Sequence, residues 1–197
     1  MSISLVIFTI ILAIIGDSVY VWSIIKGKTK PNFSGWAIFT LSMSCVLFSS
    51  YYLGAKESLI IVALFTFIAA LITFLSLKYG KYKISNFEKI LLSLSIISVI
   101  LWLTTNNPWY ALLINTFVDT LGFISIIYKL YLHPETEDSF AWTISFLVYG
   151  LNLIIITNWA LQEYLFSLTN AFWCFVILIL SFRKKNNKII KKQKNHS

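Results

Sequence analysis

The sequence predicts an all-α membrane protein of seven transmembrane helices, and three observations lead to that fold class. The chain has 197 residues, of which 58% are hydrophobic and only 12% are charged. Its mean hydropathy of +0.79 is higher than soluble domains usually have. Long apolar runs alternate with short polar breaks, and the positive charges lie in these breaks and in the C-terminal tail. We therefore expect the lipid bilayer as partner and no nucleic acid.

The individual spans follow from length, because a bilayer core needs ~20 mostly apolar residues per helix. On that basis the predicted spans are 3–26, 35–54, 58–77, 88–105, 109–131, 140–159 and 164–182. The first has no basic region before it and no small-residue cleavage site after it, so we expect a spanning helix and not a signal peptide. The breaks between spans contain Gly, Pro, Asn and Lys, which are typical of turns.

The positive charges predict how the chain crosses the membrane. Seven alternating spans place 15 of the 16 Lys and Arg residues on one side, in the loops at 26–34, 78–89 and 129–139 and in the tail from Arg183. Only Lys56 falls on the other side. Loops rich in Lys and Arg stay in the cytoplasm. This split predicts a multi-pass protein of the inner (cell) membrane with its N-terminus outside and its C-terminus in the cytoplasm.

The two halves of the sequence match each other, which predicts an internal repeat. Residues 36–79 align without gaps on 142–185 at an offset of 106, and upstream the offset is 102. The matched polar and aromatic pairs are Trp36 with Trp142, Glu57 with Glu163, Lys78 with Lys184 and Asp17 with Asp119.

The repeat predicts the domain organisation. We expect a first three-helix bundle at 1–79, a linker helix at 80–107, a second three-helix bundle at 108–185 and a basic cytoplasmic tail at 186–197. One linker helix between two three-helix copies makes both copies start on the same side of the membrane. The copies are therefore parallel repeats related by an axis along the membrane normal.

A short motif follows the first helix of each half: a basic turn, a proline, a few polar residues and a tryptophan. It reads Lys30-Pro31-Asn32-Phe33-Ser34-Gly35-Trp36 in the first half and runs from His133-Pro134 to Trp142 in the second. With this motif and the predicted 3-1-3 helix order, the chain resembles the PQ-loop and SWEET superfamily. Asn32 and Glu135 follow the prolines where the family name has glutamine. The resemblance implies a SWEET-like transporter of a small polar molecule that works by alternating access.

Asp17 and Asp119 are the ionisable residues deep inside the predicted spans, and such residues normally face a protein or water-filled interior. At 1.5 Å per residue, Asp17 lies ~13 Å from Lys26 and Asp119 lies ~15 Å from Lys129, which places both near the midplane. We expect them on facing helices, where two carboxyls could share a proton or meet a cation. The alternative is that each carboxyl fastens neighbouring helices by hydrogen bonds.

Three further residues are candidates for the substrate site. Asn115 lies one helical turn before Asp119 on the same face, and Asn170 and Trp173 add a polar and an aromatic group to the last span. The resemblance implies that Asn170 corresponds to the asparagine that lines the SWEET substrate site, although its first-half counterpart is Leu64. Single asparagines also serve as contacts between membrane helices.

The remaining polar residues point to ordinary roles. We expect Glu135, Glu137 and Asp138 to form a solvated cytoplasmic loop, and Trp36 and Trp142 to anchor helix ends at the membrane interface. The sequence shows no spacing of Cys, His or carboxylates typical of a metal site, and no catalytic set. We therefore expect no cofactor and no enzyme. A membrane receptor or assembly subunit with the same fold is the alternative to a transporter, and the oligomeric state is open.

Overall fold

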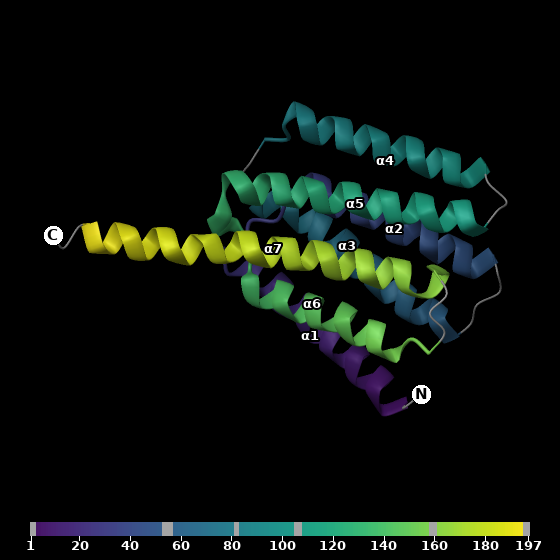
Figure 1. Ribbon diagram of the computed structural model, residues 1–197. Helices are drawn as coiled ribbons and strands as arrows, with labels where there is room; N and C mark the ends of the chain where they lie inside the picture. The colour runs from purple at the N-terminus through teal and green to yellow at the C-terminus, as the bar shows by residue number, and fades with distance from the viewer. Residues whose placement is uncertain (1–2, 53–56, 81–82, 105–107, 158–160, 195–197) are drawn as a thin grey trace. The chain divides into compact units, whose positions relative to one another are not determined.

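The computed structural model describes residues 3–52, 57–80, 83–104, 108–157 and 161–194, and this part of the chain is all-helical (Figure 1). Its seven α-helices confirm the predicted number. They are α1 (Ile3–Ile25), α2 (Phe33–Tyr52), α3 (Glu57–Tyr79), α4 (Asn86–Thr104), α5 (Pro108–Leu132), α6 (Ser139–Ile155) and α7 (Leu161–Lys194), and a 3-10 turn, η1 (Pro134–Thr136), precedes α6.

Five of these helices contain a segment long and apolar enough to cross a membrane, which makes the chain a multi-pass membrane protein. The segments are Ser4–Ile25, Val62–Tyr79, Asn86–Thr104, Leu112–Leu132 and Tyr164–Phe182. The apolar stretches of α2 and α6 are shorter, at Phe33–Phe48 and Ser139–Ile155. Seven complete spans and the orientation in the membrane stay predictions. Lys56, the single basic residue predicted on the extracellular side, is not among the described residues.

Two helix ends differ from the sequence prediction. The helix α6 ends at Ile155, and Ile156 is extended, four residues before the predicted end at 159. The helix α7 continues to Lys194, so the backbone of the predicted basic tail is helical as far as that residue. Its residues 183–194 contain no Gly or Pro and are rich in Lys, a good helix former.

Local side-chain chemistry fixes where several helices start and stop. The helix α1 is closed by Gly27 at φ 70°, where the Gly27 N–H bonds the Ile24 carbonyl at 2.8 Å and the Lys28 N–H bonds the Ser23 carbonyl at 3.0 Å. This is a Schellman motif, whose left-handed residue is usually glycine. The helix α4 starts with a capping box in which Ser85 and Glu88 bond each other's backbone N–H groups at 2.8 and 3.2 Å.

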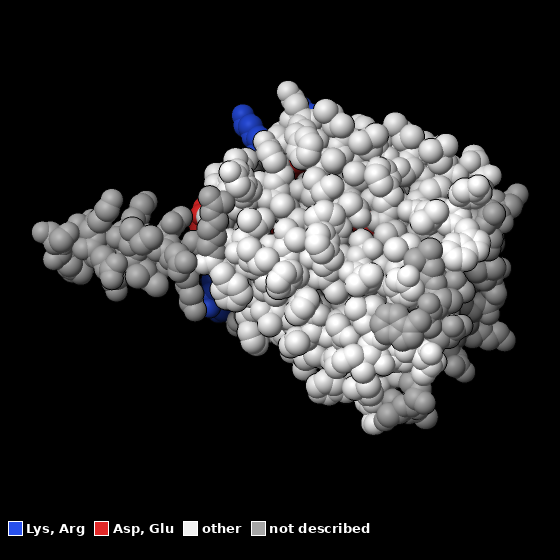
Figure 2. All heavy atoms as spheres, in the orientation of Figure 1, with Lys and Arg blue, Asp and Glu red and all other residues white. Residues whose placement is uncertain are grey.

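The helix α4 shows the membrane character of the fold most clearly, because its buried side is the more polar one. Its buried residues are Glu88, Leu91, Ser95 and Ser98, at the three- and four-residue spacing of one helix face. Its large apolar side chains are exposed, among them Ile90, Ile97, Ile100 and Leu103. Small residues inside and apolar residues outside are expected of a helix that faces lipid. On the face drawn in Figure 2, the described atoms belong almost entirely to uncharged residues.

The chain forms two compact units. The first unit contains Met1–Thr29 and Ile127–Ser197, and the second contains Lys30–Ile126. In the first unit, α6 packs against both α1 and α7, and in the second unit α2 packs against α3 and α4. The second unit also has an apolar cluster of Ile38, Leu91, Val118 and Leu121, from α2, α4 and α5. The sequence division into 1–79, 80–107 and 108–185 stays a prediction.

Glycines allow close helix approaches inside each unit. In the first unit, a Cβ on Gly16 of α1 would lie 2.8 Å from Cγ2 of Ile144 on α6. In the second unit, a Cβ on Gly35 of α2 would lie 2.5 Å from Cγ1 of Ile126 and 3.0 Å from the carbonyl oxygen of Gly122, both on α5. Real Cβ atoms do not approach other atoms this closely, so these helix crossings depend on the glycines.

Candidate functional site

The second unit holds two of the predicted site residues on one face of α5. Asp119 is 2% exposed inside the span Leu112–Leu132. Asn115, one turn earlier, is half-buried and accepts a hydrogen bond at its Oδ1 from Ser42 Oγ of α2 at 2.7 Å. The structure therefore joins an amide and a hydroxyl between α2 and α5 and buries a carboxyl one turn further along the same face of α5.

The first unit holds the other three predicted site residues. Asp17 of α1 is half-buried. Asn170 of α7 is 3% exposed, and its amide nitrogen donates to the Phe166 carbonyl of the same helix at 2.9 Å. Trp173 lies edge-on to Phe172, with ring centroids 4.9 Å apart. The predicted approach of Asp17 to Asp119 joins residues of different units and stays a prediction, as does the shared pocket with Asn170 and Trp173.

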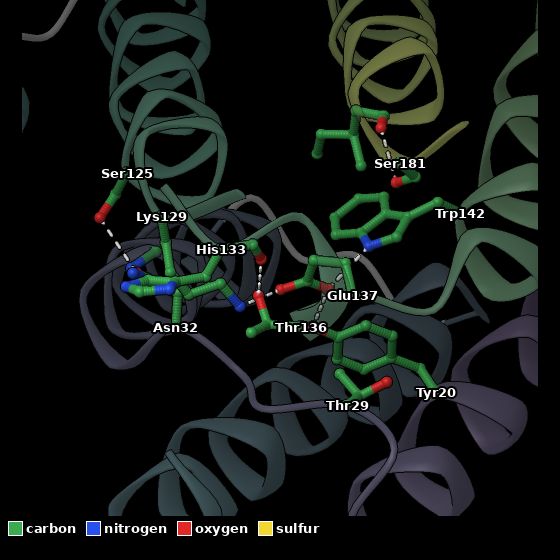
Figure 3. Close-up of polar contacts among 12 residues, drawn as sticks. Tyr20, Thr29, Asn32, Ser125, Lys129, His133, Thr136, Glu137, Trp142 and Ser181 are labelled. Carbon is green, nitrogen blue, oxygen red and sulfur yellow. Dashed lines mark hydrogen bonds and ion pairs between the residues drawn. The ribbon is translucent and has the colours of Figure 1, made fainter. Parts of the chain in front are cut away.

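The most connected polar group of the first unit is one that the sequence did not indicate. We call it the Glu137 centre, formed by Tyr20, Lys129, Glu137 and Trp142 (Figure 3). Glu137 pairs through Oε1 with the Lys129 ammonium, and both side chains are almost fully buried. Its Oε2 accepts hydrogen bonds from Tyr20 Oη at 2.7 Å and from Trp142 Nε1 at 3.0 Å. Both oxygens of this buried carboxylate therefore have partners, as a buried charge requires.

Local structure explains how the chain directs Glu137 inward. The helix α5 ends just after Lys129, and η1 then turns the chain back, with Pro134 at its start and the buried Thr136 hydroxyl donating to the His133 carbonyl at 2.7 Å. Asp138 next caps α6 by accepting from the N–H groups of Phe140 and Ala141 at 2.9 and 3.2 Å. Glu137 is thus held between a turn and a helix cap.

The second unit has a corresponding buried group, which we call the Asn32 centre, formed by Asn32, Ser85, Glu88 and Ser125. Asn32 donates through Nδ2 to Glu88 Oε1 at 2.6 Å and accepts at Oδ1 from Ser125 Oγ at 3.0 Å. The same Oδ1 caps α2 by accepting from the Gly35 N–H at 2.6 Å. Ser85 donates its hydroxyl to Glu88 Oε2 at 2.8 Å. Neutral groups thus bond both oxygens of this carboxylate.

Two sequence expectations are wrong at these centres. Glu137 is 5% exposed and paired, and does not belong to a solvated loop; only its neighbour Glu135 is well exposed, at 50% of its side chain. Trp142 is 5% exposed and bonds Glu137, so it is not an anchor at the membrane interface. The available signal was an extension of the offset of 106 by four residues, from Trp36 back to Asn32, which places Asp138 on Asn32 as matched helix caps.

Among the described residues, no group of three or more His, Cys, Asp or Glu side chains is placed to hold a metal ion. Asn115, with its Ser42 hydrogen bond, and the buried Asp119 one turn later form the polar group within the span Leu112–Leu132.

Comparison with protein-family models, with curated proteins and with solved structures finds no match.

Proposed function

We propose that the chain is a small polar molecule transporter of the SWEET-like type, in which two parallel three-helix bundles move by alternating access around a midplane site. The observation that carries the proposal is the burial of Asp119 inside a span, one turn from the Asn115–Ser42 hydrogen bond. A carboxyl at this depth is costly in a membrane protein and usually marks a solute or ion pathway.

Matched contacts in the two units support the repeat on which this mechanism depends. Asp138 caps the Ala141 N–H, and Asn32, at the matching position, caps the Gly35 N–H. The backbone N–H groups of Trp142 and Trp36 then bond the carbonyls of these two caps, each at 3.2 Å. The same backbone pattern at an offset of 106 is expected if α2 and α6 are equivalent helices of two copies.

A second match concerns the packing of the helix that begins each copy. Gly16 of α1 packs on Ile144 of α6. Their counterparts in the alignment, at offsets of 102 and 106, are Val118 of α5 and Ile38 of α2, which belong to one apolar cluster. Each proposed bundle thus places its first helix against the second helix of the other bundle. Parallel repeats related by an axis along the membrane normal have this exchange of contacts.

The proposed orientation places the N-terminus outside and the C-terminal end of α7 in the cytoplasm of an inner-membrane protein. It rests on the distribution of Lys and Arg. In this orientation the Glu137 centre lies toward the cytoplasmic end of α1, because Tyr20 is five residues before Ile25. A cysteine at Lys56 should then react with an impermeant reagent from outside the cell.

The first test is a thermal-shift screen of the purified protein against hexoses, amino acids, nucleosides and small amines. A solute that binds the folded state must raise the apparent melting temperature. For any solute that does so, Asp119→Asn should abolish the shift while the unliganded protein stays folded, because the amide keeps the shape of the side chain and removes its charge. Ser181→Ala, which removes a hydroxyl bonded within α7, should keep the shift.

Two outcomes would contradict the proposal. One is the absence of a shift with every solute, which would favour a membrane receptor or assembly subunit. The other is an equal shift in the Asp119→Asn protein, which would place the solute elsewhere. An effect of the substitution on the melting temperature alone would indicate a carboxyl that only fastens helices.

A further inference from the structure

We propose that the Glu137 centre is a latch: the Tyr20–Glu137 hydrogen bond holds α1 against α6 at the cytoplasmic end and is released when that end opens. The inference rests on the proposed transport function, because alternating access requires α1 and α6, from different bundles, to separate on one side. Tyr20 and Glu137 are residues that position the two helices and are not solute ligands.

The Tyr20–Glu137 hydrogen bond can break while the Lys129–Glu137 ion pair stays intact, because the donors to Glu137 come from different parts of the chain. Lys129, on α5, and Trp142, on α6, bond Glu137 from the same part of the chain, residues 129–142. From α1, Tyr20 reaches this carboxylate at 2.7 Å. When α1 moves away, Glu137 keeps its lysine and its indole N–H, so no buried charge is left without a partner. Water can take the place of the tyrosine hydroxyl at Oε2.

The apolar contacts beside the hydrogen bond fit the same motion. The Tyr20 ring lies edge-on to the Trp142 ring, with centroids 5.9 Å apart. Four residues deeper along α1, Gly16 packs directly on Ile144. The Tyr20–Glu137 bond therefore lies between the Gly16–Ile144 contact and the cytoplasmic end, where it controls access to that contact.

The test uses a cysteine at Ile144, which is 5% exposed in α6. The native Cys174 of α7, which is fully buried in the same unit, is kept as an internal reference, and Cys45 is replaced by alanine. A charged maleimide is added to inside-out membrane vesicles, and labelling of each cysteine is measured by mass spectrometry of its peptide. The reagent is also added to intact cells, where it reaches only the outer face.

We expect Tyr20→Phe, which removes one oxygen atom, to raise the labelling rate at position 144 from the cytoplasmic side by roughly tenfold or more. Loss of a hydrogen bond to a charged group, at ~1.5–3 kcal/mol, raises the population of the open state by about tenfold or more. The double variant Glu137→Gln with Lys129→Met, which leaves no unpaired charge in the centre, should raise the rate as well. Labelling of Cys174, and labelling of position 144 in intact cells, should not change. The matched control is Ser181→Ala, which removes a buried hydroxyl bonded only to the Ile177 carbonyl of its own helix in the described contacts.

An unchanged rate at position 144 in Tyr20→Phe would overturn the latch. So would a parallel rise at Cys174, because it would show that the centre stabilises the whole unit and does not control one contact. The labelling measures opening without any solute, so it is independent of the thermal-shift screen. If Tyr20→Phe raises labelling at position 144 but no solute gives a thermal shift, the latch stands and the transport proposal is contradicted. If a solute gives a thermal shift that depends on Asp119 but Tyr20→Phe leaves labelling unchanged, the transport proposal stands and the latch is contradicted.

Discussion

The Glu137 centre and the Asn32 centre bury a carboxylate in the same local setting but satisfy it differently. Each lies at the start of a helix that follows a proline-containing loop, and each has a cap residue, Asp138 or Asn32, bonded to a backbone N–H three residues later. Glu137 comes from the loop itself and pairs with Lys129. Glu88 comes from α4 and accepts hydrogen bonds from the neutral Asn32 and Ser85.

The difference teaches that each unit buries a carboxylate near the start of one of these helices, but with different donors around it. The loop between α1 and α2, residues 26–32, contains no Asp or Glu, so the first half cannot supply a carboxylate from its loop. The helix α4, which has no counterpart in the proposed repeat, supplies it instead. The first unit consequently depends on an ion pair, and the second depends on a chain of neutral hydrogen bonds.

Lys129→Met should have the largest effect, because it leaves Glu137 buried without its cation. Breaking a buried pair by removing one partner costs ~3–5 kcal/mol, measured as the free energy of unfolding in a bilayer-mimicking detergent. Adding Glu137→Gln to this variant should recover most of the loss, since no charge then remains buried. The comparison between the centres would fail if Asn32→Ala, which removes a neutral donor, cost as much as Lys129→Met.

Alanine at the close helix approaches should have the next largest effect and should differ between the units. Gly35→Ala meets the Gly122 carbonyl oxygen as well as Ile126, and backbone cannot move aside as a side chain can. We expect a loss of ~1–3 kcal/mol, as for overpacked cores. Gly16→Ala meets only Ile144 side-chain atoms within 4 Å and should cost less.

Gly150 of α6 provides the control for both substitutions, because a Cβ there would have no atom within 4 Å. Gly150→Ala should leave the free energy of unfolding unchanged or raise it by up to ~1 kcal/mol through helix propensity. A loss at Gly150 equal to that at Gly35 would show that the cost does not come from the helix crossing.

Substitutions of Asp138 should have the smallest effect on the free energy of unfolding. They test whether Asp138 of α6 and Asn32 of α2 act as equivalent helix caps. Asp138→Ala removes the side-chain cap of α6 and should cost ~1 kcal/mol. Asp138→Asn introduces the residue that the first half has at this place, and asparagine caps about as well as aspartate. Thermal unfolding of the two variants should therefore separate them, with Asn close to the parent protein. Equal losses would mean that the charge of Asp138, and not its cap geometry, matters.

The sequence predicted the seven helices well because apolar run length is a direct physical signal for a membrane helix. It placed the end of α6 four residues too late, because hydropathy marks the extent of an apolar run and not the residue at which the helix ends. Burial of Asp119 was also predictable, since a carboxyl in the middle of a span avoids lipid. The partner of Asn115 was not, because Ser42 lies 73 residues away in the sequence.

The Glu137 centre could not be predicted in the same way. A cluster of Glu135, Glu137 and Asp138 beside a proline has the composition of a solvated loop. The η1 turn places the three side chains in different environments: Glu135 is exposed, Glu137 is buried and Asp138 caps α6. Only the position of Lys129, eight residues earlier and on the last turn of α5, decides that the inward carboxylate has a cation.

The length of α7 has a mechanical consequence. The helix runs without a break from Leu161 to Lys194 (Figure 1), so 12 residues, or ~18 Å, continue past the apolar segment that ends at Phe182. A continuous helix transmits tilt and rotation along its axis, as a lever does. Any reorientation of its membrane-embedded part would therefore sweep the lysine-rich end through the aqueous space, where a fluorophore attached near Lys194 could report it.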